Sequence, residues 1–130
     1  MKTYCLLNHT LTEAQLAELK QRYHSTQVVY PPEDISAAWS QLSPGLAYDT
    51  NVIKAVLYWL DAAEPGDAVI IQGEAGSTFI LVDYLLSRNL IPLHAVSRRV
   101  SVEEHAGEMV KKSLIFKHVC FRPYCRLEDL

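Results

Sequence analysis

The side chains best suited to chemistry fall in three short stretches of the chain. These are the polar turn Asn8-His9-Thr10, the glycine turn 72–78 and the basic pair Arg98-Arg99. A histidine can transfer protons near neutral pH, and glycines let a ligand approach the backbone closely. Arginines bind phosphate through paired donors. This mixture predicts a site for a phosphate-bearing ligand.

The glycine turn is the centre of this hypothesis. It follows the apolar run 68–71, which does not alternate and therefore predicts a strand covered on both faces. Ser77 and Thr78 stand where a helix would begin, and free N–H groups at a helix start favour an anion. Glu74 could hold a ribose hydroxyl or could merely favour the helix N-terminus. Most such turns only reverse the chain, so the turn by itself is a weak indication.

The pattern of apolar residues predicts the elements that must position these stretches. Thr12 and Gln15 have the spacing of a capping box, which predicts a helix start. The order strand, helix, strand, helix, helix, strand, helix, strand indicates an α/β sandwich with a mostly parallel sheet. Ligands of such sheets bind at the carboxyl ends of the strands. The predicted strands are 3–7, 26–30, 68–71 and 91–96, and the three loops predicted at that edge carry Asn8, His9 and Thr10, then Gln72 to Thr78, then Ser97, Arg98 and Arg99.

The C-terminal part predicts a β-hairpin addition. Val100-Ser101-Val102 alternates, and His105-Ala106-Gly107 is typical of a hairpin turn. In a regular strand Lys117 and Val119 would share one face, and His118 and Cys120 the other. The basic residues here, with Arg122, would form either a charged edge that discourages aggregation or a cationic wall over a ligand.

Composition excludes several function classes. The 130 residues predict a single domain, 1–130, with a net charge of −3. Residues 1–97 carry a net charge of −5 and residues 98–130 a net charge of +2, whereas a binder of long nucleic acid would be basic overall. No apolar run has the length of a membrane span, and the N-terminus leaves no room for a signal peptide. Three cysteines in dissimilar contexts predict reduced, cytoplasmic thiols, and we predict neither metal nor cofactor.

Three motifs resemble those of a small CRISPR-associated family. The segment 8–15 resembles its His-x-Leu-Thr-x-x-Gln opening, and the segment 72–79 its Gln-Gly-Glu-x-Gly-Ala-Thr turn. The segment 116–122 is similar to its Phe-Lys-His-Val-Arg-Phe-Arg tail. Cys120 stands where the family has arginine, and Ser77 where it has alanine. The first change removes a cation from the tail.

The resemblance implies both fold and function. The family is related to the CARF (CRISPR-associated Rossmann-fold) superfamily, which implies a Rossmann-like three-layer sandwich and a homodimer in type III CRISPR systems. It implies a ring nuclease that cleaves cyclic oligoadenylate, with the four-membered ring expected first, by metal-independent attack of a ribose 2′-OH. On this reading the catalytic residues are His9, Arg98 and Lys117. The expected ligand contacts are Asn8, Thr10, Gln72, Gly73, Glu74, Gly76, Ser77, Thr78, Arg99, His118 and Arg122.

Two alternatives remain open on the sequence alone. The same pocket could sense or sequester the messenger without cutting it. The chain could also be a nucleotide-binding Rossmann-like domain unconnected with CRISPR, which would prefer mononucleotides.

Overall fold

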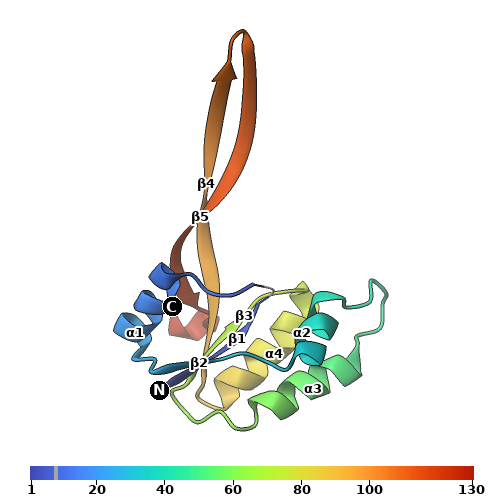
Figure 1. Ribbon diagram of the computed structural model, residues 1–130. Helices are drawn as coiled ribbons and strands as arrows, with labels where there is room; N and C mark the ends of the chain where they lie inside the picture. The colour runs from blue at the N-terminus through green and yellow to red at the C-terminus, as the bar shows by residue number, and fades with distance from the viewer. Residues whose placement is uncertain (8) are drawn as a thin grey trace.

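A computed structural model describes residues 1–7 and 9–130 and contains one five-stranded sheet with helices on both faces (Figure 1). The strand order is β2-β1-β3-β4-β5. The first four strands are parallel, and β5 runs antiparallel to β4. The predicted α/β class, mostly parallel sheet and C-terminal hairpin are therefore confirmed. The strands are β1 (Lys2–Leu6), β2 (Gln27–Val29), β3 (Ala68–Ile71), β4 (Ile91–Ala106) and β5 (Met109–Pro123).

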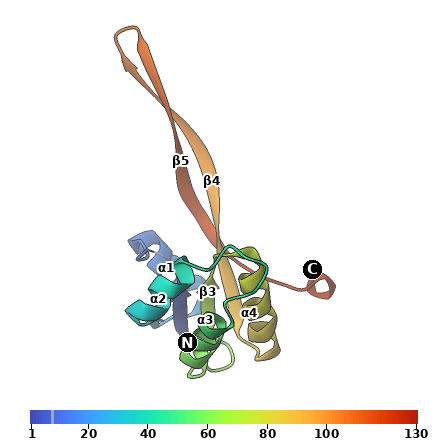
Figure 2. The same cartoon turned by 90° about the vertical axis from the view of Figure 1, so that its right-hand side faces the viewer.

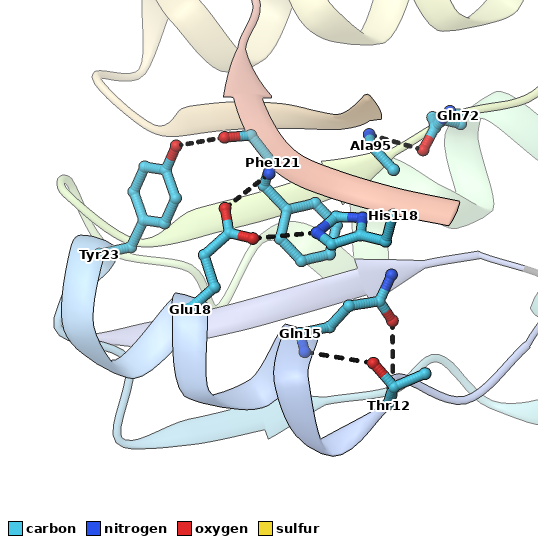
Figure 3. Close-up of polar contacts among 8 residues, drawn as sticks. All are labelled: Thr12, Gln15, Glu18, Tyr23, Gln72, Ala95, His118 and Phe121. Carbon is cyan, nitrogen blue, oxygen red and sulfur yellow. Dashed lines mark hydrogen bonds and ion pairs between the residues drawn. The ribbon is translucent and has the colours of Figure 1, made fainter. Parts of the chain in front are cut away.

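The helices begin and end close to the predicted signals. Thr12 forms the predicted capping box: its hydroxyl accepts from Gln15 N at 3.2 Å, and Gln15 Oε1 accepts from Thr12 N at 3.0 Å (Figure 3). Asn89, with φ 59°, is in the left-handed conformation just after α4, which asparagine tolerates better than most residues. The helices are α1 (Glu13–Tyr23), α2 (Glu33–Ser40), α3 (Thr50–Leu60) and α4 (Ala75–Ser87), followed by a short 3₁₀ turn (Leu127–Asp129).

The sheet separates two hydrophobic cores. Val69 and Ile71 of β3 pack with α2, α3 and α4, whereas Ala68 and Ile70 pack on the side of α1. Every residue of β3 is therefore buried, which explains its run of apolar residues without alternation. Figure 2 shows α1 on one side of the strands and α4 on the other.

The hairpin of β4 and β5 is far longer than the sequence predicted. β4 was expected to end at residue 96, but it continues to Ala106 and pairs with β5 along its whole length. Ser97, Arg98 and Arg99 are therefore in a strand, and the prediction of a loop there was wrong. The chain reverses at Gly107-Glu108, close to the predicted turn, and Gly107 has φ 64°. We call residues 97–119 the arm; it projects from the rest of the protein in both views (Figures 1 and 2).

A β-bulge at the base of the arm changes which side chains share a face. Val96 pairs with Cys120 and Ser97 with His118, so Val119 is the extra residue. His118 and Phe121 consequently point to the same face, that of α1, where their rings lie 4.7 Å apart. His118, Val119 and Cys120 all line one depression beside α1, so the bulge interrupts the regular alternation that was predicted for this segment.

Candidate functional site

The three predicted stretches meet at one edge of the sheet. The turn containing His9 and Thr10 follows β1, the glycine turn follows the neighbouring β3, and the arm leaves the same edge as a continuation of β4 (Figure 1). Parallel strands place their carboxyl ends together, which is why residues far apart in sequence gather here. Asn8, a predicted ligand contact, lies outside the described residues.

Gln72 ties the glycine turn to its neighbours. Its Oε1 accepts from Ala95 N at 2.9 Å (Figure 3). Its backbone carbonyl accepts from Trp39 Nε1 at 2.9 Å. The first bond extends the contact between β3 and β4 beyond their last paired residues, Ile70 and Leu93. The amide predicted to face a ligand therefore joins two strands where they begin to separate.

Aromatic side chains explain both glycines of the turn. A Cβ at Gly73 would lie 2.8 Å from the indole ring of Trp39, which is itself buried. A Cβ at Gly76 would clash with the hydroxyl of Tyr48. Close approach to the backbone is required here, as predicted, but Trp39 and Tyr48 make it.

The N-terminus of α4 is already capped by a carboxylate. Glu74 accepts from Ser77 N at 2.5 Å, and Ser77 and Thr78 are both buried. A negatively charged cap satisfies the free N–H group and complements the helix dipole. A phosphate at this position would have to displace Glu74. The structure thus accounts for Glu74 and Ser77 N by a contact within the chain, whereas the buried hydroxyl of Thr78 has no hydrogen-bond partner among the described residues.

The predicted basic residues divide between the two faces of the sheet. Leu93 belongs to the core on the α1 side, so alternation turns His94 and Arg98 towards the side of α2, α3 and α4. The register pairs these two with Arg122 and Lys117, which share their face. Arg99 and His118 point to the α1 side instead. The residues predicted to form either a charged edge or a cationic wall are thus divided, with Lys117 and Arg122 on one face and His118 on the other.

Arg98 and Lys117 are directly opposite one another on adjacent strands. Both are exposed, and like charges at opposed positions destabilise a sheet. A bound anion between them would remove that cost. Arg98 lies three residues beyond Ala95, hence about 10 Å along the strand from the bond to Gln72.

His9 is exposed and has one hydrogen-bonded ring nitrogen. Its Nδ1 lies 3.0 Å from the carbonyl oxygen of Thr10. Because a carbonyl oxygen only accepts, Nδ1 donates in this bond and Nε2 keeps a free lone pair. That tautomer makes Nε2 available as a proton acceptor at the sheet edge.

His118, a predicted ligand contact, is engaged with α1. Its Nε2 lies 2.9 Å from Glu18 Oε1, while the second carboxylate oxygen of Glu18 accepts from Phe121 N at 2.6 Å (Figure 3). Tyr23 donates to the carbonyl oxygen of Phe121 at 2.9 Å. These bonds fasten α1 to β5. Nothing in the helical spacing of Glu18 distinguished it from an ordinary surface residue.

A pocket of about 640 Å³ lies beside α4, between the glycine turn and the chain after β5. Tyr124 fixes that chain segment: it donates to the carbonyl oxygen of Ile71 at 2.8 Å, and its ring lies 4.7 Å from that of His94. Burial, with a smaller contribution from Arg122, lowers the pKa of His94. The predicted glycine turn forms one wall of this pocket, but the pocket itself was not predicted, because its other wall, 124–127, meets the turn only after folding. It is lined by Gln72, Gly73, Ala75, Thr78, Phe79, Val82, Asp83, Leu86, Tyr124, Cys125, Arg126 and Leu127.

Cysteines and metal-binding groups add no further site. Cys5, Cys120 and Cys125 are free thiols, and burial raises the pKa of Cys5 to about 12. Within residues 1–7 and 9–130, no three His, Cys, Asp or Glu side chains gather as metal ligands. In the same part of the chain, no helix combines the length and the apolar character needed to cross a membrane.

Comparison with known proteins identifies the family. The profile of the uncharacterized protein MJ1673 family matches residues 1–122. The chain belongs to this family. It is 28% identical to the Uncharacterized protein MJ1673 of Methanocaldococcus jannaschii over 124 residues, which are 95% of this chain and 96% of that protein. No solved structure matches the chain significantly. The match to the MJ1673 family includes β4 and β5, so the arm is part of the family's common sequence.

Proposed function

We propose that this protein is a ring nuclease that cuts cyclic oligoadenylate, with cyclic tetra-adenylate as its first substrate, and so ends type III CRISPR signalling. Three motifs in the order of the CRISPR-associated family support this proposal. The observation that carries it furthest is the opposed pair of Arg98 and Lys117 at the carboxyl edge of the sheet. On this proposal the fold is a CARF-related, Rossmann-like sandwich and the protein acts in the cytoplasm.

The proposed reaction needs no group beyond the chain and its ligand. The ribose 2′-oxygen attacks the adjacent phosphorus, and the bond from phosphorus to the 5′-oxygen breaks. The products are a 2′,3′-cyclic phosphate and a free 5′-hydroxyl. The proton of the 2′-OH leaves and the 5′-oxygen gains one, so the protein must position the three atoms in line and stabilise the developing charge.

Each catalytic candidate takes a role that its surroundings support. Arg98 and Lys117 would bind the phosphate and neutralise the charge that develops on it. His9 Nε2 would accept the proton of the 2′-OH, since Nδ1 donates to Thr10. Arg122 would extend the basic face towards the body of the protein. Arg99 and His118, on the other face, are removed from our list of ligand contacts.

The pocket beside α4 suits an adenine base. Phe79 is 73% exposed at its wall, and Tyr124 provides a second aromatic ring. Aromatic rings stack on bases, and such stacking contributes roughly 1–3 kcal/mol per base. Asp83 can accept a hydrogen bond from the exocyclic amine of adenine. The pocket lies on the same side of the sheet as Arg98 and Lys117.

A second candidate is a protein that binds the messenger without cutting it. The cap formed by Glu74 favours this candidate, because its carboxylate already accepts from Ser77 N at the start of α4. One fewer backbone donor would then be free to stabilise the reacting phosphate.

The test is an incubation of purified protein with rings of three, four and six adenylates, with and without EDTA. We expect linear products in both conditions. His9→Ala should slow the reaction by roughly 10²–10⁴-fold if the histidine transfers a proton, and Arg98→Ala and Lys117→Ala should also slow it. Lys20→Ala, an exposed cation on α1 outside this site, is the matched control and should leave the rate within a few-fold.

Three outcomes would change the proposal. Tight binding with intact ligand would establish the sensor instead of the nuclease. Undiminished turnover in the variants of His9, Arg98 and Lys117 would reject this site but not the activity. Preference for mononucleotides would favour a nucleotide-binding domain unconnected with CRISPR, as would a gene that lies away from type III CRISPR genes.

A further inference from the structure

One edge of β4 has no strand beside it in the arm. β4 pairs with β3 only from Ile91 to Leu93, and the bond from Ala95 to Gln72 is the last contact on that side. Farther out, β4 pairs with β5 alone within the described chain. An isolated two-stranded hairpin is marginally stable in water, and an unpaired edge is a template for another strand. The arm therefore presents a surface that one chain leaves open.

The backbone groups of the open edge can be assigned. Ala95 N–H points to the β3 side, since it donates to Gln72. Backbone groups alternate in direction along a strand. The residues that direct both N–H and C=O to the open edge are therefore Ser97, Arg99, Ser101, Glu103 and His105.

The side chains along this edge are self-complementary. The sequence 98–104 reads Arg-Arg-Val-Ser-Val-Glu-Glu. When two copies of this segment run antiparallel about Ser101, Arg98 faces the partner's Glu104, and Arg99 faces the partner's Glu103. Val100 then faces the partner's Val102, and Ser101 faces itself. Opposite charges and β-branched pairs at opposed positions stabilise a sheet.

We propose that two copies of the chain form a dimer by pairing the open edges of β4 antiparallel about Ser101. The product is a continuous four-stranded ribbon in the order β5-β4-β4-β5. Ser101 and its copy form a hydrogen-bonded pair, and so do Arg99 and the partner's Glu103. Arg98 and the partner's Glu104 form a non-hydrogen-bonded pair, in which side chains lie closest.

The length of the open edge supports the same register independently of charge. The open part of β4 runs from residue 96 to Ala106, and Ser101 is its midpoint. Pairing about Ser101 therefore covers all of it, about 33 Å, without leaving a segment uncovered. Val96 then lies opposite the partner's Ala106, so the tip of each arm ends beside the partner's Gln72.

The outer edge of β5 does not offer an equivalent arrangement. Antiparallel self-pairing of β5 about Leu114 would place Lys111 opposite the partner's Lys117, and like charges at opposed positions are unfavourable. Parallel self-pairing of either strand would align identical charges. The antiparallel β4 register is thus favoured by opposite charges that face one another within it. The β5 pairing about Leu114 and the parallel pairings are disfavoured by like charges that would face one another.

The dimer also relieves the repulsion within one arm. Arg98 is opposed by Lys117 on β5 and would gain the partner's Glu104 on its other side. Glu103 already lies 3.7 Å from Lys112, and would gain the partner's Arg99. The two carboxyl edges would face one another along the ribbon. This inference rests on the arm alone and does not require the proposed ring nuclease activity.

Charge reversal with a complementary mixture tests the register. We expect wild-type protein to sediment at twice the mass of one chain. Glu103→Arg/Glu104→Arg should weaken the dimer by at least ~100-fold, because every charged pair becomes repulsive, and Arg98→Glu/Arg99→Glu should do the same. An equimolar mixture of the two variants should restore a dimer, since each Arg then faces a Glu. Glu128→Arg/Asp129→Arg makes the same change in net charge outside the arm and should remain dimeric.

The outcomes separate the proposal from its competitors. Restored association in the mixture also shows that both variants are folded. A wild-type monomer at ~100 µM would overturn the proposal, as would a dimer that either reversal leaves unchanged. Circular dichroism of each variant identifies a loss of folding, and in that case the crosslinking test below decides.

Disulfide crosslinking tests the two-fold axis directly. Opposed Cα atoms of a hydrogen-bonded pair are about 5.5 Å apart, within the usual range for a disulfide. With Cys120 and Cys125 replaced by serine, Ser101→Cys should form a covalent dimer under mild oxidation. Ser113→Cys, on β5 and separated from its copy by both β4 strands, should not. Equal crosslinking of the two variants, or none at residue 101, would contradict the register.

Discussion

The body of the protein and the arm differ in whether their distinctive residues find packing or hydrogen-bond partners within the same chain. In the body, Gly73 is accounted for by Trp39, Glu74 by the start of α4, and Gln72 by Ala95. In the arm, Arg98 faces another cation and one backbone edge has no strand beside it. A motif whose residues are packed or hydrogen-bonded within the chain does not require a ligand to account for them. Opposed cations and an unpaired strand edge, by contrast, favour binding of an anion or of another strand.

Two phenylalanines of β5 give the largest expected contrast. Phe121 is fully buried in the core on the α1 side, whereas Phe116 is 64% exposed, and its ring centroid lies 5.6 Å from Cζ of Arg99. Phe121→Ala should lower the free energy of unfolding by about 3–5 kcal/mol through loss of burial and creation of a cavity. Phe116→Ala should lower it by less than about 1 kcal/mol. Urea denaturation of both variants measures the difference, and equal losses would show that the arm is part of the folding core.

The contact between α1 and β5 should be sensitive to one carboxylate. Glu18→Ala removes the acceptor of both Phe121 N and His118 Nε2, and we expect a loss of about 1–3 kcal/mol, since a partly buried donor is left unpaired. Lys20→Ala, on the exposed side of the same helix, should change stability by less than about 0.5 kcal/mol. Thermal unfolding compares the two. A neutral Glu18→Ala variant would mean that packing of Phe121 alone holds α1.

The glycine turn can be tested for internal packing. Gly73→Ala places a Cβ against the buried indole ring of Trp39 and should cost about 1–3 kcal/mol. Gly45→Ala is the control, because no atom lies within 4 Å of its added Cβ, and it should be neutral or slightly stabilising. Unfolding of each variant without ligand is the measurement. If Gly73→Ala kept full stability but lost ligand binding, the turn would serve the ligand after all.

The smallest expected effect is the pH dependence contributed by His94. Burial lowers its pKa below the ordinary value of 6.5, so the unfolded chain binds the proton more tightly than the folded chain. The resulting stability is present above pH 6.5 and is lost as the pH falls through the folded pKa. His94→Gln should therefore lose less stability than wild type between pH 7.5 and pH 5.5. His105→Gln, in the exposed arm, is the matched control and should follow wild type.

Short-range sequence patterns predicted much of the body. The capping box at Thr12 and the buried strand 68–71 each follow from such patterns, which packing then reinforces. The placement of the turns after 3–7 and 68–71 at one edge of the sheet was also predicted, because parallel strands joined by helices bring their carboxyl ends together. These features depend on residues close in the chain or on periodicity, both of which are readable in one sequence.

The remaining features depend on contacts between distant parts of the chain. The bulge at Val96 and Ser97 moved His118 to α1, and the length of β4 converted a predicted loop into an arm. The pocket beside α4 arose where the chain after β5 folds back. Each of these features depends on a strand or helix that is distant in sequence. Contacts across such distances set the register of the strands and the exposure of their side chains. The absence of a neighbouring strand beyond Ala95 leaves the edge of β4 open within the described chain, and our proposal is that a second copy pairs with it.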